Sequence, residues 1–334
     1  MASTRVLIIL MGSLGDVARA LCVAHALKRA APEVHITWLI ENANRALVEG
    51  HPDIDAVIVF RRGAFVRSFV SAVRQMRALR IDVVLDLQRI LKSGVFSFAS
   101  GAKRRIGFSP ANSKEFNWIF NTETVPFVDE SKVSKVLHYL EFVKALGLPV
   151  GPVKFGLDFM IRDYSGKYAD FPPSYLVLVL ASRWDTKNWE LAGFRELIDR
   201  LLTSSSMRVI LLGDKSCDAS AKQLESQLNS ARIVNLVSRT TLVDLAWILS
   251  RAAVCVGPDS GPGHMAAALG VPYITLFGPT AIARVAPWSF EKLAISANAS
   301  CSPCGLRKCP GFDKLCMRMI SADTVFRAIQ EGGY

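Results

Sequence analysis

The sequence of 334 residues has no apolar run near the roughly 18 residues that a membrane-spanning helix requires. Its first apolar stretch, residues 6–11, stops at Gly12 and is too short for the core of a signal peptide. We therefore expect a soluble, cytoplasmic protein that is not secreted, with this stretch as a buried first strand. Internal repeats and low-complexity tracts are also absent, so repeat architectures are not indicated.

Acidic residues are fewer than basic ones, 29 against 40, and the resulting net charge of +11 indicates acidic partners. The imbalance is concentrated between Arg61 and Arg105, where eleven Lys or Arg residues stand against two Asp residues. Neither a zinc-finger spacing nor an RNA-binding aromatic motif accompanies this charge. We therefore expect anionic partners other than nucleic acid.

Within this basic segment, residues 65–79 have the periodicity of an amphipathic helix. One face would carry Phe65, Phe69, Ala72, Met76 and Leu79, and the opposite face Arg67 and Arg74. The simplest interpretation is a helix that packs on the core and exposes a solvated basic face. The alternative is a basic face that contacts anionic lipid phosphates or an anionic acceptor.

Short apolar runs with helical patterns between them occur in two successive series, which predicts an α/β protein with parallel sheets. The expected strands are residues 6–11, 34–40, 56–60, 83–87 and 104–108, and then 175–181, 209–212, 233–237, 254–256 and 273–277. We expect one domain over residues 1–155, a linker over 156–173 and a second domain over 174–320. A last helix of about residues 321–334 could pack back on the first domain.

The first strand leads into a glycine-containing turn, Gly12-Ser13-Leu14-Gly15-Asp16, after which a helix begins. Its spacing is not the dinucleotide fingerprint, and no Lys-Ser/Thr pair marks a phosphate loop. Asp16 lies where the free N–H groups of a helix stabilise a carboxylate. It is therefore either a helix cap or a base placed beyond the carboxyl end of a strand, where ligands of open α/β sheets bind.

A second turn of this kind, residues 258–264 with the sequence Pro-Asp-Ser-Gly-Pro-Gly-His, follows a strand of the second series. A Ser-Gly-x-Gly turn that opens a helix presents N–H groups to an anion. His264 alone among the five histidines lies in a glycine-rich turn. It is either a structural residue or an additional donor to the bound anion.

Seven cysteines are present, and Cys22, Cys217 and Cys255 have apolar neighbours typical of core residues. The other four are clustered near the C-terminus at positions Cys301, Cys304, Cys309 and Cys316. They could hold a structural zinc or iron, form disulfides or remain reduced thiols. A catalytic role for them is not indicated.

Further motifs extend over nearly the whole chain in a fixed order. They are Asp-Leu-Gln at 86–88, Lys-Arg-Arg-Ile-Gly-Phe at 103–108, a loop with Lys-Asn-Trp at 187–189, Asp-Ser-Gly-Pro-Gly-His at 259–264, Phe-Gly-Pro-Thr at 277–280 and the cysteine tail. Together with the Gly-Asp turn at 12–16, this set resembles the lipopolysaccharide core heptosyltransferases.

The resemblance implies the GT-B fold, in which two Rossmann-like domains, acceptor-binding and then donor-binding, face a central cleft. It implies an inverting, metal-independent transfer of heptose from ADP-heptose to the inner core of lipopolysaccharide, with no cofactor. That acceptor is anionic and lies in a membrane. The enzyme would therefore associate peripherally with the inner face of the inner membrane.

By position in the motifs, Asp16 resembles the family's general base and Lys187 its catalytic, diphosphate-binding lysine. The other donor-binding residues implied are Ser182, Thr240, Asp259, Ser260, Gly261, Gly263 and His264. The acceptor-binding residues implied are Gly15, Arg61, Arg62, Gln88, Lys92 and Lys114. This set suits the reaction, because a carboxylate can deprotonate the attacking hydroxyl and cationic and N–H donors can stabilise a leaving diphosphate.

Two positions depart from the family pattern. Gln88-Arg89 stands where the family often has Gln-Gly, and Lys114-Glu115 stands where an Arg-Glu pair is common. Both lie in the acceptor half, so three alternatives remain for the function. They are a related GT-B transferase with another donor or a protein acceptor, a nucleotide-sugar epimerase of the same fold, and a binding protein without catalysis.

Overall fold

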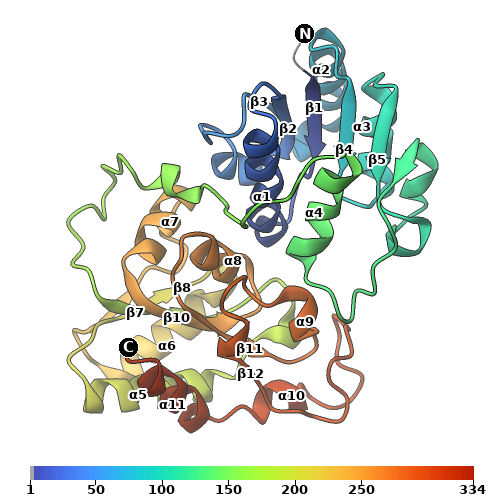
Figure 1. The fold of residues 1–334 in the computed structure, drawn as a ribbon. Helices are drawn as coiled ribbons and strands as arrows, with labels where there is room; N and C mark the ends of the chain where they lie inside the picture. Colours follow the sequence, from blue (N-terminus) through green and yellow to red (C-terminus); the bar gives the residue numbers. More distant parts are fainter. Residues whose placement is uncertain (1–3) are drawn as a thin grey trace. The chain divides into compact units, whose positions relative to one another are not determined.

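The computed structural model describes residues 4–334, which form two compact units that divide between Arg162 and Asp163 (Figure 1). The division falls inside the segment 156–173 that the sequence indicates as a linker. Each unit contains one six-stranded parallel sheet covered by helices. The predicted α/β fold with two doubly wound sheets is confirmed, and this is the architecture of the GT-B class.

The sheet of the first unit has the strand order β3-β2-β1-β4-β5-β6, and all its pairs are parallel. Its strands are β1 Arg5–Ile9, β2 His35–Glu41, β3 Ala56–Phe60, β4 Val83–Asp86, β5 Arg104–Gly107 and β6 Glu123–Thr124. The central strands are nearly continuous apolar runs because both faces of the sheet are covered.

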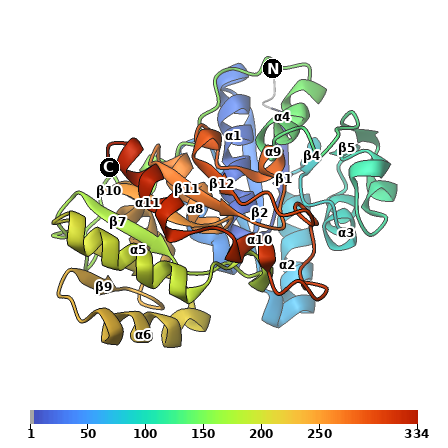
Figure 2. The ribbon, with the colours of Figure 1, turned by 90° about the horizontal axis from the view of Figure 1, so that it is seen from below.

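Four α-helices cover this sheet: α1 Leu14–Ala30, α2 Phe65–Ala78, α3 Leu91–Ala99 and α4 Lys135–Ala145. Helices α1 and α4 pack against each other, and α2 packs on α3, so the two pairs cover opposite faces (Figure 2). Short 3-10 helices lie in the connections at Asn42–Leu47, Arg62–Ala64, Pro110–Asn112, Asn117–Phe120 and Leu157–Met160.

Helix α2 differs in one respect from its sequence prediction. Ala72 and Met76 are buried in the core as expected. Phe65, which the periodicity placed on the same face, is 49% exposed. The helix begins at Phe65, directly after a 3-10 turn, and its first turn lies at the edge of the covered surface.

The second unit repeats the same winding with the strand order β12-β11-β10-β7-β8-β9. Its strands are β7 Tyr175–Val179, β8 Val209–Leu212, β9 Ile233–Asn235, β10 Ala252–Pro258, β11 Tyr273–Phe277 and β12 Ala294–Ser296. Its helices are α5 Leu191–Ser204, α6 Asp218–Leu228, α7 Leu242–Ser250, α8 Gly261–Ala268, α9 Ile282–Val285, α10 Leu315–Arg318 and α11 Ala322–Glu331. Three-residue 3-10 turns lie at Asp185–Lys187, Lys215–Cys217 and Glu291–Leu293.

The last helix, α11, packs against α5 and belongs to the second unit. Val325 and Ile329 are buried in the core of that unit together with Phe194 and Leu197 of α5. The sequence left open that this helix packs on the first domain. Its apolar stripe is instead used within the second unit, because α5 presents a matching apolar face there.

In each unit the winding reverses between two neighbouring central strands, β1 and β4 in the first and β7 and β10 in the second. The connections that follow these strands diverge to opposite faces, which leaves room for a ligand at the carboxyl edge. The loops after these four strands are therefore where chemistry is expected. Among residues 4–334, no helix has the length and apolarity needed to span a bilayer.

Candidate active site

Asp16 lies in the first turn of α1, beyond the carboxyl end of β1. Ser13 is the N-cap of this helix, and Asp16 is its partner in a capping box. The Ser13 hydroxyl donates to Asp16 Oδ2 over 3.0 Å, and the Ser13 N–H donates to the same oxygen over 3.4 Å. Asp16 therefore has the capping role that its position predicts, and one fifth of its side chain remains exposed.

Two cations contact the other oxygen of Asp16. Arg19 donates to Oδ1 over 2.7 Å, and the ammonium of Lys135, at the start of α4, donates to the same atom. Burial of Asp16 by itself raises the pKa of its carboxyl, but Lys135 and Arg19 together lower that pKa well below its usual range. The carboxylate thus stays ionised at neutral pH.

Gln88, at the carboxyl end of β4, holds the turn that carries Asp16. Its Oε1 accepts hydrogen bonds from Met11 N at 2.8 Å and Gly12 N at 3.3 Å, and its Nε2 donates to Gly12 O at 2.8 Å. These three contacts occupy the amide. Gln88, expected as an acceptor-binding residue, is therefore seen here fixing the glycine turn across the switch point.

Arg89 adopts a left-handed backbone conformation, with φ of 68°. This conformation favours glycine, the residue common at this position in the family. The Arg89 guanidinium pairs with Glu130, donates to Asn112 O over 3.0 Å and lies over the Phe108 ring. These contacts fix the Arg89 side chain at a position where the resemblance leads us to expect glycine.

The cationic residues predicted to bind acceptor lie in the connections after the strands of the same sheet, with Arg62 in a 3-10 turn and Lys92 in the first turn of α3. Arg62 and Lys92 converge on Glu41 with contacts of 2.9 Å each. Arg61, directly after β3, and Lys114 are exposed. Gly15 is buried within the first turn of α1. The structure thus gathers these residues at one edge, with two of the four cations already paired to a carboxylate.

Lys187 and Asp259 form a buried ion pair in the second unit, with Lys187 Nζ 2.6 Å from Asp259 Oδ2. Lys187 lies in the loop after β7, and Asp259 directly follows β10. His264 Nε2 lies 3.3 Å from Asp259 Oδ1, and the Thr280 hydroxyl donates to Oδ2 over 3.1 Å. The lysine and the histidine predicted to bind donor are thus brought together on one buried carboxylate.

Helix α8 begins with the residues predicted to hold an anion. Ser260 is its N-cap, and Gly261, Gly263 and His264 form its first turn. Glycine is required at position 263, because a Cβ there would lie 2.7 Å from the Tyr273 ring. The N–H groups at this helix start, next to Lys187, form an arrangement suited to a diphosphate.

Two further predicted donor residues, Ser182 and Thr240, lie in loops of the second unit. Ser182 is engaged within its own loop, where its N–H donates to Asn188 over 2.7 Å and its hydroxyl donates to Trp184 O over 3.1 Å. Thr240 directly precedes Thr241, the N-cap of α7. Ser182 therefore shapes the loop of Lys187, and Thr240 lies near the carboxyl end of β9.

Three residues of the site, Lys135, Trp184 and Thr280, are not among the predicted site residues. Lys135 contacts Asp16 from a helix more than a hundred residues away, and Thr280 shares Asp259 with Lys187. Trp184 lies beside two cations, with Lys187 Nζ at 4.5 Å and the Arg307 guanidinium at 4.8 Å from its ring centre. The Phe-Gly-Pro-Thr motif would have indicated Thr280, whereas the other two depend on tertiary packing.

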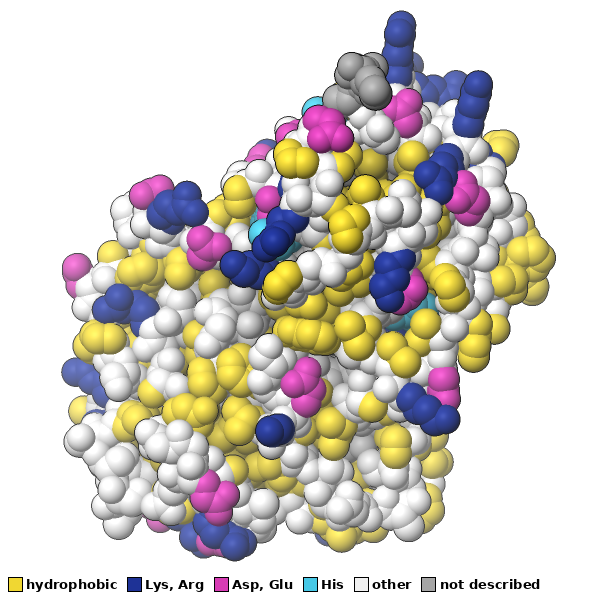
Figure 3. Space-filling view, viewed as in Figure 1, with side chains coloured by type: hydrophobic (Ala, Val, Ile, Leu, Met, Phe, Trp, Pro, Cys, Tyr) yellow, Lys and Arg dark blue, Asp and Glu magenta, His cyan; other side chains and the backbone are white. Residues whose placement is uncertain are grey.

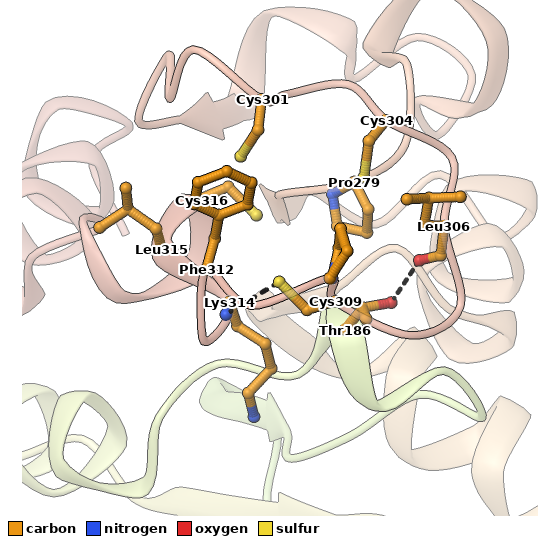
Figure 4. Close-up of a pocket in the computed structure, with 11 residues that line it drawn as sticks. Thr186, Pro279, Cys301, Cys304, Leu306, Cys309, Phe312, Lys314, Leu315 and Cys316 are labelled. Carbon is orange, nitrogen blue, oxygen red and sulfur yellow. Dashed lines mark hydrogen bonds between the residues drawn. The ribbon is translucent and has the colours of Figure 1, made fainter.

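The cysteine tail packs against the donor loop. Cys301, Cys304, Cys309 and Cys316 line one pocket, and Thr186 donates to Leu306 O over 2.9 Å across it (Figure 4). None of the seven cysteines forms a disulfide. Within residues 4–334, no group of three or more His, Cys, Asp or Glu side chains is arranged to hold a metal ion. In this structure the four thiols of the tail are unbridged and line the pocket.

Comparison with known proteins agrees with these features. The model of glycosyltransferase family 9 (heptosyltransferase) matches residues 69–313, more than half of the chain and the part that includes Lys187 and the 259–264 turn. The chain belongs to this family. It is therefore a glycosyltransferase, as its sequence motifs predict.

Two curated members of the family match most of the chain. Lipopolysaccharide heptosyltransferase 1 of Pseudomonas aeruginosa is 27% identical over 319 residues, which cover 91% of this chain and 87% of that protein. Lipopolysaccharide core heptosyltransferase OpsX of Haemophilus influenzae is 25% identical, with coverage of 84% and 81%. Among solved structures, the E. coli heptosyltransferase WaaC with ADP has a TM-score of 0.78 at 23% identity and covers 98% of this chain and 100% of its own.

Asp86, at the end of β4, is a fully buried carboxylate whose hydrogen-bond donors are all neutral groups. Asn117 Nδ2 and Gln88 N donate to it over 2.8 Å and 3.0 Å. Burial raises the pKa of Asp86 to about 6 despite these hydrogen bonds. Because the pKa of Asp86 is higher in the folded than in the unfolded protein, its protonated form contributes to the unfolding free energy. This contribution is complete below about pH 4 and is lost as pH rises through about 6.

We predict that this component of the unfolding free energy, roughly 3 kcal/mol at about 1.4 kcal/mol for each pKa unit, is absent in Asp86→Asn. The amide does not titrate, so the unfolding free energy of the variant should not fall between pH 4 and pH 7 from this cause. This holds even if its unfolding free energy differs from the parent's by a constant amount. Chemical denaturation of both proteins at several pH values in this range measures the difference. Parallel curves for the two proteins would show that Asp86 does not titrate there.

Proposed function

We propose that this protein transfers a heptose from an ADP-activated donor to the inner core of a lipopolysaccharide precursor, with inversion at the anomeric carbon and without a metal. Family membership supports heptosyl transfer, and the curated relatives act on lipopolysaccharide by name. The solved relative WaaC was determined with ADP. The observation that carries the proposal is an ionised carboxylate at one switch point and a cationic, N–H-rich turn at the other.

Asp16 takes the proton from the acceptor hydroxyl while that oxygen attacks the anomeric carbon. The bond from this carbon to the diphosphate oxygen breaks, and ADP leaves with the electron pair. Lys187 and the N–H groups at the start of α8 stabilise the charge that develops on the leaving phosphate. His264, on the same helix turn, is a further donor to that phosphate, and Asp259 orients Lys187 and contacts the donor sugar.

The base assignment predicts that Asp16→Asn and Asp16→Ala lower turnover about a hundredfold or more, while donor affinity changes little. The asparagine keeps an oxygen for the capping box, so its fold should be retained; the unfolding temperature checks this. Release of ADP that depends on added acceptor is the assay, since an epimerase or a binding protein would show none. Asp82→Asn, on the opposite edge of the same sheet, is the control. Parental turnover in both Asp16 variants would leave Asp16 as a cap only.

The donor assignment predicts that Lys187→Gln weakens ADP binding at least tenfold and slows transfer, because a charge-assisted contact is lost. Activity should persist in a chelator such as EDTA. Calorimetric ADP titration measures the first effect, with Lys222→Gln, an exposed lysine of α6, as the control. Lys187→Gln also leaves Asp259 without its cation, so unfolding is followed in parallel. Strict dependence on added Mg²⁺ or Mn²⁺ would contradict the metal-independent mechanism.

We further propose peripheral contact of the first unit with an anionic membrane, where the acceptor lies. Helix α2 has three arginines and no acidic residue, and its exposed surface also includes Val66 and Val70. Phe98 of α3 and Trp118, which follows β5, are further exposed apolar side chains of this unit. Hydrophobic side chains gather at the outer edge of the first unit in Figure 3. Exposed apolar groups beside cations suit a surface that contains both acyl chains and phosphates.

This proposal predicts that the protein sediments with anionic vesicles at low salt and is released at high salt, because surface charges are screened within a Debye length. Reversal of Arg67 and Arg74 to Glu should weaken vesicle binding several-fold and leave ADP affinity unchanged. Reversal of Arg195 and Lys222, two exposed cations of the second unit, changes the net charge equally and serves as the control. Equal binding to neutral and anionic vesicles would make the basic face ordinary solvated surface.

A further inference from the structure

Lys135 is the first residue of α4, and its ammonium reaches Asp16 because α4 packs along α1 (Figure 1). Its side chain is only 17% exposed, and that of Arg19, on the same carboxylate oxygen, is 8% exposed. Neither the motifs of the sequence nor the family resemblance singles out this lysine. Asp16 is thus held by two largely buried cations from two helices.

The two oxygens of Asp16 have different partners. Oδ1 accepts hydrogen bonds from Arg19 and Lys135, both cationic. Within residues 4–334, Oδ2 accepts hydrogen bonds from Ser13 alone, through its hydroxyl and its N–H. An oxygen that already accepts from two cations is a poor site for a further proton, because protonation would forfeit one of those contacts. A proton arriving at Asp16 is therefore directed to Oδ2.

The second cation is costly to keep at this place. Burial of Lys135 and the nearby charges of Arg19 and Arg89 lower the pKa of its ammonium to about 8, although Asp16 opposes this change. Arg19 alone would neutralise the charge of Asp16. A buried charge retained at such a cost, at the edge where the reaction is proposed, indicates a functional requirement for it.

We infer that Lys135 is a positioning residue for the general base: its ammonium holds Asp16 Oδ1 so that Oδ2 is presented to the acceptor hydroxyl. This inference rests on the proposed function of Asp16. The charged groups around the pair are Arg19 on α1, Arg89 after β4, Glu130 and its neighbour His138. Arg89 and His138 both lie close to Glu130. On α4, the ionisable side chain that contacts Asp16 is therefore Lys135 and not His138.

The test compares the pH profiles of kcat in the parent, Lys135→Met and Lys135→Arg. Loss of the cation should lower kcat at neutral pH about tenfold or more and move the acid limb to higher pH, because the pKa of Asp16 rises without Lys135. Lys135→Arg should restore kcat and remove the alkaline limb that deprotonation of the lysine gives the parent near pH 8. Lys132→Met, an exposed lysine of the preceding loop, is the matched control and should keep the parental profile.

Calorimetric titration with ADP should give parental affinity for all these variants, because the donor residues lie in the other unit. A purely structural role would lower the unfolding temperature of Lys135→Met and leave both limbs in place. Parental kcat and limbs in Lys135→Met, combined with an inactive Asp16→Asn, would overturn this inference alone. Parental turnover in Asp16→Asn would instead overturn the proposed function. If Lys135→Met does not fold, the alkaline limb of Lys135→Arg decides: an unchanged limb near pH 8 excludes the role.

Discussion

The arrangement of both sites depends on one constraint, the reversal of winding at the centre of each parallel sheet. In both units the first and fourth strands are neighbours, and the connections that follow them leave toward opposite faces. The turns that follow these strands are therefore adjacent without covering each other. Asp16 and Gln88 follow the two central strands of the first unit, and Lys187 and Asp259 follow those of the second.

Charge compensation explains how these edges hold buried carboxylates. Asp16 is reached by two cations, and the pKa of its carboxyl is lowered. Asp86 ends β4, the strand next to β1. It accepts hydrogen bonds from an amide, a hydroxyl and the backbone, and burial raises its pKa to about 6. Both lie at the same sheet edge, Asp86 fully buried and Asp16 with one fifth of its side chain exposed. The difference in direction follows from the partners, because neutral donors do not offset the desolvation of a full charge.

The donor site is supported by the cysteine-containing segment that follows β12. Gly305 N donates to Pro279 O over 2.6 Å, and Thr186 donates to Leu306 O, so this segment connects the loop after β11 with the loop of Lys187. Both loops contribute a partner to Asp259, through Thr280 and Lys187. The four thiols thus lie in a segment that contacts both donor loops.

Much of the fold was predictable because the signals are local. Ten of the strands are apolar runs in alternation with helical patterns, and the glycine turns mark their carboxyl ends. Strands β6, Glu123–Thr124, and β12, Ala294–Ser296, were missed, since they are two and three residues long and carry no buried residue. Strand β6 pairs with β5, and β12 pairs with β11, so each satisfies backbone groups that would otherwise lie at the edge of its sheet. A pattern of apolar residues carries no information about such pairing.

The sequence by itself determined the two parallel sheets, the positions of Asp16, Lys187 and His264 and the family. Each depends on strand periodicity, turn chemistry or motif spacing over a few residues. Tertiary structure alone decided the partners of those residues. Lys135 contacts Asp16 only because α4 packs on α1, and Gln88 is occupied by the Gly12 backbone only because β4 pairs with β1. Such contacts join residues far apart in the chain, and the distances that set charge and orientation arise only on packing.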